Sequence, residues 1–426
     1  MKYLTSLLLT IAPLSAFGAD FDSGDSAWIM SATALVLFMT LPGLALFYGG
    51  LVRSSNVLSV LMQCFCITAT ASLVWVAFGY SLAFGEGGNL IGDFSRILLT
   101  GIDRESASGS IPESLFAMFQ MTFAIITPAL VVGGFAERIR FSAVLVFTVL
   151  WLAAVYIPIT HWVWGGGWLA ELGLLDFAGG TVVHITAGVA ALVAALVIGP
   201  REGFGKLPMT PHNMPLSVAG AGMLWVGWFG FNGGSALAAG GDGSMAILVT
   251  HISACCGTLV WVACEWRKFG KPTALGAITG MVAGLGTITP ASGYVGPGGA
   301  ILIGMISGMA CFYATLTVKN RFKIDDSLDV FPVHGVGGII GTILAGVFCS
   351  TSLGAFSGYG FADGISTIIE QIGVQGIGVV ATIAWTALAT WVILKLIDHM
   401  IGLRVSQDEE AKGLDVSYHG ERAYEI

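Results

Sequence analysis

The chain has 426 residues, of which 55% are hydrophobic and only 10% are charged, and its mean hydropathy is +0.84. Soluble domains carry about 25% charged residues, so the composition excludes a soluble enzyme, which needs more polar surface to cover its core. It also excludes a disordered chain, because such chains are poor in aliphatic and aromatic residues. The net charge of −8 leaves no basic surface for nucleic acid. We therefore predict an integral membrane protein.

The first residues are typical of a secretory signal peptide. Lys2 precedes the short apolar stretch 4–14, and small residues follow at Ala16 and Gly18. This stretch is shorter than the about 20 residues that a helix needs to cross a bilayer. We predict that residues 1–18 are a signal peptide that is cleaved, which puts the mature N-terminus outside the cytoplasm. A retained segment at the membrane interface is the alternative.

Ten stretches without Asp, Glu, Lys or Arg follow, and each is long enough to cross a membrane. The longest, 272–318, is divided by the segment 290–297, which contains two prolines and two glycines and predicts a turn between two helices. The sequence thus predicts an all-α membrane domain of eleven spans over residues 19–403, and a C-terminal tail over 404–426. The ten stretches are 26–52, 54–85, 114–136, 141–170, 177–200, 207–241, 243–264, 272–318, 330–362 and 371–394.

Cations gather on one side of this map. Of the eighteen Lys and Arg residues, only Arg96 and Arg104 fall on the other side, and Lys2 lies in the signal peptide. The positive-inside rule then predicts an external N-terminus and a cytoplasmic tail. The residues on the cytoplasmic side are Arg53, Arg138, Arg140, Arg201, Lys206, Arg267, Lys268, Lys271, Lys319, Arg321, Lys323, Lys395, Arg404, Lys412 and Arg422.

Two histidines occupy matching places in the order of helices. His184 lies early in predicted helix 5 and His334 early in predicted helix 10. This match favours an inverted repeat of five plus five helices, with the eleventh helix extra. A lone buried histidine is more often structural, but two facing neutral imidazoles can pass a proton, because each ring has a donor and an acceptor nitrogen.

Other candidates lie near these histidines. Asp176 precedes helix 5, and we interpret it first as an N-terminal cap and second as a group that attracts a cation. Beside a histidine pair, a set of aromatic residues predicts a pore that binds a small cation, whereas Trp162 and Trp225 are interpreted as an interfacial belt. The aromatic set, on helices 3, 4 and 6, is Phe119, Phe123, Trp164, Trp228 and Phe231.

Six segments together resemble one family. They are 119–123 (FQMTF), 133–142 (GGFAERIRFS), 176–184 (DFAGGTVVH), 228–232 (WFGFN), 289–291 (TPA) and 325–335 (DDSLDVFPVHG). In this order and spacing the chain resembles the Amt/Mep/Rh family of ammonium transporters, of the bacterial AmtB type.

The resemblance implies a homotrimer of eleven-helix subunits in the bacterial cytoplasmic membrane, each subunit with its own pore. It implies ammonium as substrate, methylammonium as an analogue, and a PII-family signal protein as a partner at the cytoplasmic face. It also assigns residues by their motifs. The outer recruitment site is Phe119, Trp164 and Ser235, supported by Asp176; the gate is Phe123 and Phe231; the pore and proton relay are His184, His334, Trp228 and Thr289.

The chemistry of ammonium gives this assignment a mechanism. An indole holds a small cation with about 0.5–2 kcal/mol, and an apolar pore rejects a bare charge but admits neutral ammonia. We therefore expect deprotonation outside, passage of ammonia and electrogenic proton transfer by the histidine pair. A passive ammonia channel and an ammonium sensor are the alternatives. No nucleophile with a base and no metal-ligand group is evident, so we expect neither an enzyme nor a cofactor.

Overall fold

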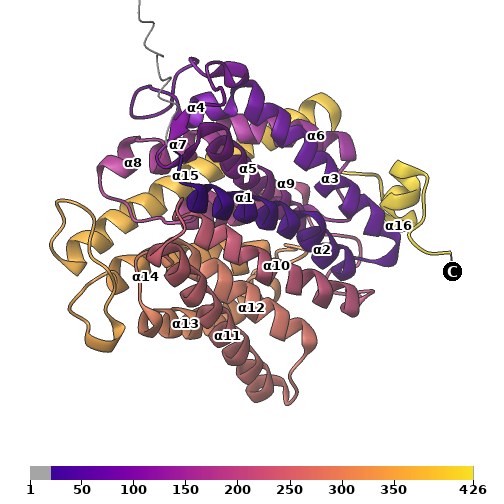
Figure 1. Cartoon of the computed structure of the whole chain (residues 1–426). Helices are drawn as coiled ribbons and strands as arrows, with labels where there is room; N and C mark the ends of the chain where they lie inside the picture. The colour runs from indigo at the N-terminus through magenta and orange to yellow at the C-terminus, as the bar shows by residue number, and fades with distance from the viewer. Residues whose placement is uncertain (1–20, 426) are drawn as a thin grey trace, which may run out of the picture.

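The computed structural model describes residues 21–425, so the predicted signal peptide lies outside the described residues. The described chain is a bundle of helices (Figure 1), with a two-residue strand pair, β1 (Ala107–Ser108) and β2 (Ile111–Pro112), before the third span. Within residues 21–425, eleven helical segments are long and apolar enough to cross a membrane. The prediction of an all-α protein with eleven membrane spans is confirmed.

Several spans contain a turn of π-helix or 3-10 helix. Spans 1 to 5 are built from α1 (Ser23–Phe38), η1 (Met39–Leu44) and α2 (Ala45–Leu51); η2 (Ser54–Asn56), α3 (Val57–Val74), η3 (Trp75–Gly79) and α4 (Tyr80–Phe84); α5 (Glu113–Phe135); α6 (Phe141–Trp151), η5 (Leu152–Tyr156), α7 (Ile157–Trp164) and α8 (Trp168–Glu171); and η6 (Gly180–Ile185) with α9 (Thr186–Ile198). Spans 6 to 11 are α10 (Met214–Gly234); α11 (Gly241–Phe269); α12 (Ala274–Ile288) with η7 (Thr289–Ala291); α13 (Pro297–Leu316) with η8 (Thr317–Arg321); η9 (Phe331–Gly335) with α14 (Val336–Phe348); and α15 (Ile368–Ile401). Short turns η4 (Ile97–Leu99) and η10 (Gly354–Phe356) lie in connections, and α16 (Gln407–Lys412) and η11 (Asp415–His419) form the tail.

The predicted division of the stretch 272–318 is correct. One helical segment ends at Ala291, and α13 begins at Pro297. Proline suits the first position of a helix, because the N–H that it lacks would have no partner there.

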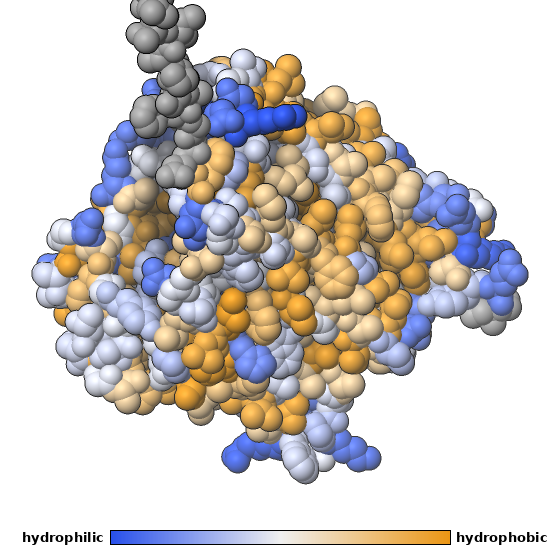
Figure 2. Space-filling view, in the orientation of Figure 1, coloured by the Kyte–Doolittle hydropathy of each residue, from blue (hydrophilic) through white to orange (hydrophobic). Residues whose placement is uncertain are grey.

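The surface is apolar in the middle and polar at its ends. Figure 2 shows orange residues over the centre of this face and blue residues along its left edge and on the tail at the right. Glycines allow the helices to approach closely inside the bundle: a Cβ on Gly188 would overlap the backbone of Gly335, and one on Gly134 would overlap Ala191. In lipid, such close packing replaces the hydrophobic driving force that soluble helices have.

The two histidine segments have the same construction. His184 lies in η6, which the thirteen-residue helix α9 follows, and His334 lies in η9, which the thirteen-residue helix α14 follows. Each helix packs against the π-helical turn of the other segment, α9 against η9 and α14 against η6. This exchange supports the prediction of two related halves that meet at the histidines.

A buried ion-pair network lies at the end of the bundle that carries the tail, here called the tail side. Glu137 accepts hydrogen bonds from Arg53 Nε at 3.0 Å and Arg201 Nη1 at 2.7 Å, and Arg201 also binds Asp325 through Nε at 2.9 Å and Nη2 at 2.8 Å. Burial alone would raise the pKa of Glu137, but the charges of Arg201 and Arg53 outweigh it, so this pKa lies below its ordinary value. The network also holds Glu137 at φ +75°, where residues other than glycine are uncommon.

The tail is folded onto this network (Figure 1, right). Asp415 accepts hydrogen bonds from the amides of Leu58 at 3.1 Å and Ser59 at 2.7 Å, at the start of α3. Asn56 joins the two features, because its Nδ2 donates to Glu137 and its Oδ1 accepts from the amide of Leu414. Tail and membrane domain therefore form one packed unit in the described chain.

We predict that Glu137→Gln destabilises the folded protein. Removing one partner from a buried ion pair costs about 3–5 kcal/mol, so the Tm in detergent falls at neutral pH. A carboxyl with a lowered folded-state pKa stabilises the fold above its ordinary value of 4.5 and loses that contribution as the pH falls through the folded value. Parent and variant therefore converge in acid. The matched control is Glu421→Gln at an exposed tail position; equal Tm values for both variants would contradict the prediction.

Candidate functional site

Three cavities follow one another through the bundle. They are called the far-side cavity, which lies opposite the tail, the central cavity and the tail-side cavity. The volume that the centre of a water-sized sphere can occupy is about 300 Å³ in the far-side cavity, about 10 Å³ in the central cavity and about 80 Å³ in the tail-side cavity. The central volume is close to the smallest that holds a single water molecule. The far-side lining is Phe84, Phe116, Gln120, Phe123, Val163, Trp164, Phe177, Ser235 and Leu237; the central lining is Leu44, Phe47, Ile126, Leu130, Val183, His184, Leu224, Trp228, Phe231, Val282 and His334.

Trp164 and Ser235 both line the far-side cavity. The Trp164 indole donates from Nε1 to the carbonyl oxygen of Asp176 at 2.8 Å, and the Ser235 hydroxyl donates to the carbonyl oxygen of Phe231 at 2.8 Å. Because this bond holds the edge of the ring, the indole is fixed in the wall of the cavity, and an indole face can bind a cation by a cation–π contact. The hydroxyl oxygen of Ser235 retains lone pairs that can accept a hydrogen bond from a cation.

Two residues assigned to this outer site do not line the cavity. Phe119 is fully buried and packs edge-on behind Phe123, with ring centroids 5.1 Å apart. The Asp176 carboxylate is also buried and accepts hydrogen bonds from the amides of Gly179, Gly180 and Thr181 at 2.6–2.8 Å, and from the Thr181 hydroxyl. Asp176 thus has the geometry of the helix cap that we preferred, and it reaches the cavity only through the carbonyl that holds Trp164.

The cavity has aromatic walls that the sequence reasoning missed. Phe84, Phe116 and Phe177 complete the lining. Phe116 lies seven residues before Phe123, which places both on one face of α5, so helical periodicity was an available signal. Phe84 and Phe177 come from other segments, and no local pattern brings them there.

A stacked phenylalanine pair separates the far-side and central cavities. The ring centroids of Phe123 and Phe231 lie 4.4 Å apart, and Trp164 packs edge-on against Phe123 at 5.8 Å. A solute that passes from one cavity to the other must displace these rings, so their position is that of a gate.

His184 and His334 meet in the central cavity. Their Nδ1 atoms lie 3.2 Å apart, and the ring planes are inclined by 21°. Trp228 stacks on His184 at 5.5 Å and is oriented by its Nε1 hydrogen bond to Thr289 Oγ1 at 2.9 Å. His184 Nε2 is buried and has no hydrogen-bond partner among residues 21–425, which leaves it available to a solute. Thr289 is not among the lining residues of this cavity, but it bonds Trp228, which is.

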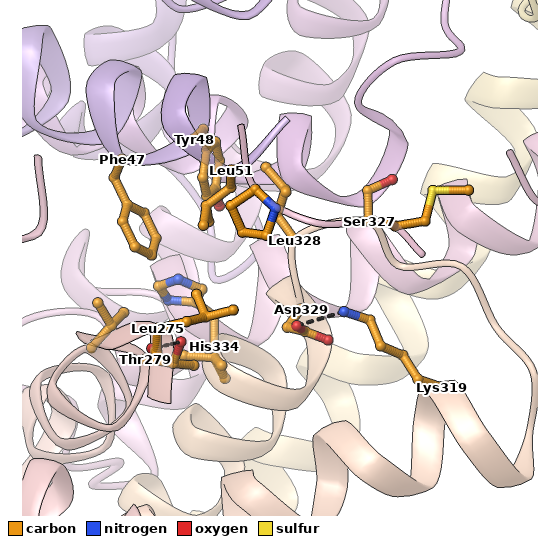
Figure 3. Close-up of a pocket in the computed structure, with 14 residues that line it drawn as sticks. Phe47, Tyr48, Leu51, Leu275, Thr279, Lys319, Ser327, Leu328, Asp329 and His334 are labelled. Atoms are coloured by element: carbon orange, nitrogen blue, oxygen red, sulfur yellow. Dashed lines mark hydrogen bonds and ion pairs between the residues drawn. The ribbon is translucent and has the colours of Figure 1, made fainter. Parts of the chain in front are cut away.

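The tail-side cavity opens beyond His334 (Figure 3). His334, Phe47 and Val282 line both this cavity and the central one, so the two cavities adjoin. Its polar rim contains an ion pair between Lys319 Nζ and Asp329 Oδ2 at 2.7 Å. The remaining lining is Tyr48, Leu51, Met209, Pro211, Leu275, Thr279, Ser327, Leu328 and Val333.

Asp326 is a further residue that the sequence reasoning missed. It accepts a hydrogen bond from the amide of Phe331 at 2.7 Å and so caps the π-turn that carries His334. Burial and the neighbouring charge of Asp329 raise the pKa of Asp326 to about 7. The signal was the spacing, because Asp326 precedes His334 by eight residues, as Asp176 precedes His184.

One aromatic interpretation is wrong. Trp162, expected to face lipid at the interface, is buried and donates from Nε1 to the carbonyl oxygen of Leu90 at 2.8 Å. The indole N–H has an internal acceptor in the connection that follows α4, and hydropathy does not reveal such a contact. Trp225 is partly buried and packs on His251.

In the described chain, eleven membrane spans surround a row of narrow cavities, and this architecture is typical of a membrane transport protein for a small solute. The Ammonium Transporter Family model matches residues 27–424. The chain is 46% identical to an ammonium transporter of Bacillus subtilis, covering 94% of this chain and 98% of that protein, and 43% identical to Amt1 of Archaeoglobus fulgidus, covering 95% and 100%. The chain belongs to the ammonium transporter family, whose members are transporters rather than enzymes.

Solved structures agree with this membership. Mep2 of Saccharomyces cerevisiae superposes with a TM-score of 0.83 at 37% identity, covering 91% of both chains. A protein named Sensor Amt Protein superposes with a TM-score of 0.86 at 31% identity, covering 93% of this chain and 98% of that one.

Proposed function

We propose that this ammonium transporter works in the bacterial cytoplasmic membrane by separating ammonium into ammonia and a proton. Ammonium binds in the far-side cavity, which faces outside; ammonia passes the Phe123–Phe231 gate; and the proton moves along His184 and His334 to the inside. The observation that carries this proposal is the 3.2 Å contact between the two Nδ1 atoms, placed in the narrowest part of the path.

The size of the central cavity supports the separation of charge from nitrogen. A space of about 10 Å³ for the centre of a water-sized sphere has no room for a hydrated cation. Its lining is apolar apart from the histidines and Trp228, so an unhydrated ion would lose its solvation without replacement. Neutral ammonia needs no hydration shell and loses no ionic solvation, so neither cost applies to it. Potassium is rejected because it cannot release a proton.

The histidine geometry supports a proton relay. One Nδ1 must donate and the other must accept for the pair to bond at 3.2 Å. A proton that arrives at the free Nε2 of His184 converts that ring to a double donor, and the shared hydrogen then passes to His334. His334 also lines the tail-side cavity, so the proton leaves where ammonia emerges and ammonium forms again.

Two other functions are compared with proton-coupled transport. A passive ammonia channel uses the same path without proton transfer, and the likeness to a protein named as a sensor raises a signalling role. The succession of cavities through the bundle favours transport as the main role.

Trp164→Leu should weaken saturable methylammonium uptake mainly at low concentration. Losing one cation–π contact removes about 0.5–2 kcal/mol, which corresponds to roughly 2- to 30-fold in affinity. Labelled methylammonium uptake into cells at a range of concentrations measures this change. Unchanged concentration dependence in a well-expressed variant would remove Trp164 from the binding site.

The histidine pair is tested by replacing both residues with leucine. In proteoliposomes, an ammonium pulse should give an inward positive current with the parent and none with the double variant, because the relay is broken. Current and labelled flux are measured on the same vesicles. His251→Gln, which changes a histidine on the exposed face of α11, is the control and should keep the current. A parent without ammonium-dependent current would establish the gas channel instead, and a double variant with the parent's current would refute the relay.

The orientation of the protein in the membrane can be tested separately. A reporter fused after Ile426 should be active only in the cytoplasm, since the cation distribution places the tail inside. Activity on the outside would reverse both the far-side and tail-side assignments.

The family also suggests partners. We propose a homotrimer, and a PII-family signal protein that blocks the tail-side cavity when internal nitrogen is sufficient. Co-purification from ammonium-shocked cells should recover the PII protein. If removal of residues 404–426 left PII inhibition intact, the tail would have no part in that contact.

A further inference from the structure

A fourth cavity lies between the tail and the start of span 2, and it shares no lining residue with the three cavities of the path. The centre of a water-sized sphere can occupy about 220 Å³ in it, well above the ~10–15 Å³ that one water molecule needs. This cavity is called the tail pocket below. Its polar lining comes from η2 and from the tail: Ser54, Ser55, Lys412, Asp415, Arg422 and Tyr424.

Hydrogen bonds at two places hold the tail over this pocket. Asp415 accepts from two amides at the start of α3. Further along the tail, the Tyr424 hydroxyl bonds Nε2 of His212 at 3.0 Å and accepts a hydrogen bond from Nδ2 of Asn213 at 3.4 Å. Arg422 lies between these two ties, so the tail wall of the pocket is fixed at both ends.

The tail pocket has an excess of positive charge. Within residues 21–425, neither Lys412 nor Arg422 forms an ion pair. Asp415 is the one carboxylate in the described lining, and both of its oxygens already accept amide hydrogens of α3. The acidic residues Glu421 and Glu425, which are close in sequence, do not line the pocket. Two cations without a partner thus share this space with one carboxylate that is already bonded.

The hydrogen-bond donors of the pocket match a phosphate group. Two serine hydroxyls, an ammonium and a guanidinium line it, and each of these groups can donate. A phosphate group offers negative charge and several strong acceptor oxygens. A guanidinium binds such a group through two parallel hydrogen bonds, and a lysine binds it as a point charge. A carboxylate has only two oxygens in one plane, so a tetrahedral phosphate uses donors from separate segments more fully.

We propose that the tail pocket binds a phosphate group, and that the bound group stabilises the docked tail. The phosphate joins the serine hydroxyls of η2 to Lys412 and Arg422, which lie at the two ends of the segment 412–422. The group belongs either to the headgroup of an anionic lipid at the tail-side surface or to a soluble phosphate. The site is separate from the ammonium path, because the two have no lining residue in common.

The test is the hydrogen exchange of the tail segment 412–424, followed by mass spectrometry on the full chain in a neutral detergent. Inorganic phosphate is compared with chloride at equal ionic strength and pH, and anionic dioctanoyl phosphatidylglycerol with zwitterionic dioctanoyl phosphatidylcholine. At least one of the two anionic phosphate probes should slow the exchange, because a ligand that binds only the docked tail stabilises it. Slowing by the lipid alone assigns the site to a headgroup, and slowing by inorganic phosphate shows that it takes a free phosphate.

The two cations are tested with the double variant Lys412→Gln, Arg422→Gln. It should raise the half-effective concentration of the active probe about 4- to 25-fold, since one exposed ion pair contributes about 2- to 5-fold. The matched control is Lys206→Gln, which removes an exposed cation outside the pocket and should leave this concentration unchanged. Without a probe, the double variant and the parent should exchange alike, because neither cation forms an ion pair in the described chain.

Two results overturn the proposal: no slowing of exchange by either probe, or the same half-effective concentration in the parent and the double variant. If the double variant exchanges faster even without a probe, its tail has loosened, and Ser55→Ala replaces it. This change removes one hydroxyl donor and leaves both cations in place. It should still raise the half-effective concentration, and an unchanged value would again contradict a phosphate site.

Discussion

The contact between the Nδ1 atoms of His184 and His334 is the constraint on which the structure depends. In an apolar cavity the two imidazoles satisfy one nitrogen each by bonding to one another, and this lowers the free-energy cost of burying their polar groups. Asp176 and Asp326, each eight residues upstream, hold the π-turns that carry the rings. The contact is therefore set by two capped segments that cross, and by the absence of a side chain at Gly188 and Gly335 where they cross.

The buried ions on the tail side extend this constraint. Arg201 follows the helix that begins beside His184, and Asp325 immediately precedes the residue that caps the segment of His334. Their two-bond ion pair thus ties the far end of one histidine segment to the beginning of the other. Glu137 shares Arg201 and, through Asn56, connects both to the tail. The tail is thus linked to the histidine segments through packed contacts, although none of residues 404–425 lines a cavity of the path.

The sequence predicted the spans well because lipid imposes a simple rule. Each membrane span must satisfy its backbone N–H and C=O groups by internal hydrogen bonds, as a helix does. A long stretch without charged residues is therefore sufficient evidence for a helical span. Side-chain surroundings follow no such rule. Phe119 was assigned to the outer site but packs behind Phe123, and Trp162 was assigned to the interfacial belt but donates to the carbonyl oxygen of Leu90. Phe84 reaches the cavity from another segment of the chain. These positions depend on contacts between residues distant in sequence, which periodicity does not encode.

The narrowness of the central cavity has an electrical consequence. A bacterial membrane stores energy as a voltage, and moving one elementary charge across 100 mV releases about 2.3 kcal/mol. An unbroken file of water between the two larger cavities would conduct protons continuously and discharge that store. The constriction of about 10 Å³ between the stacked rings of Phe123 and Phe231 and the Nδ1 pair has room for about one water molecule, so it interrupts such a file. Because the water file is interrupted, a path for ammonia can exist without a continuous leak of protons that would dissipate the membrane voltage.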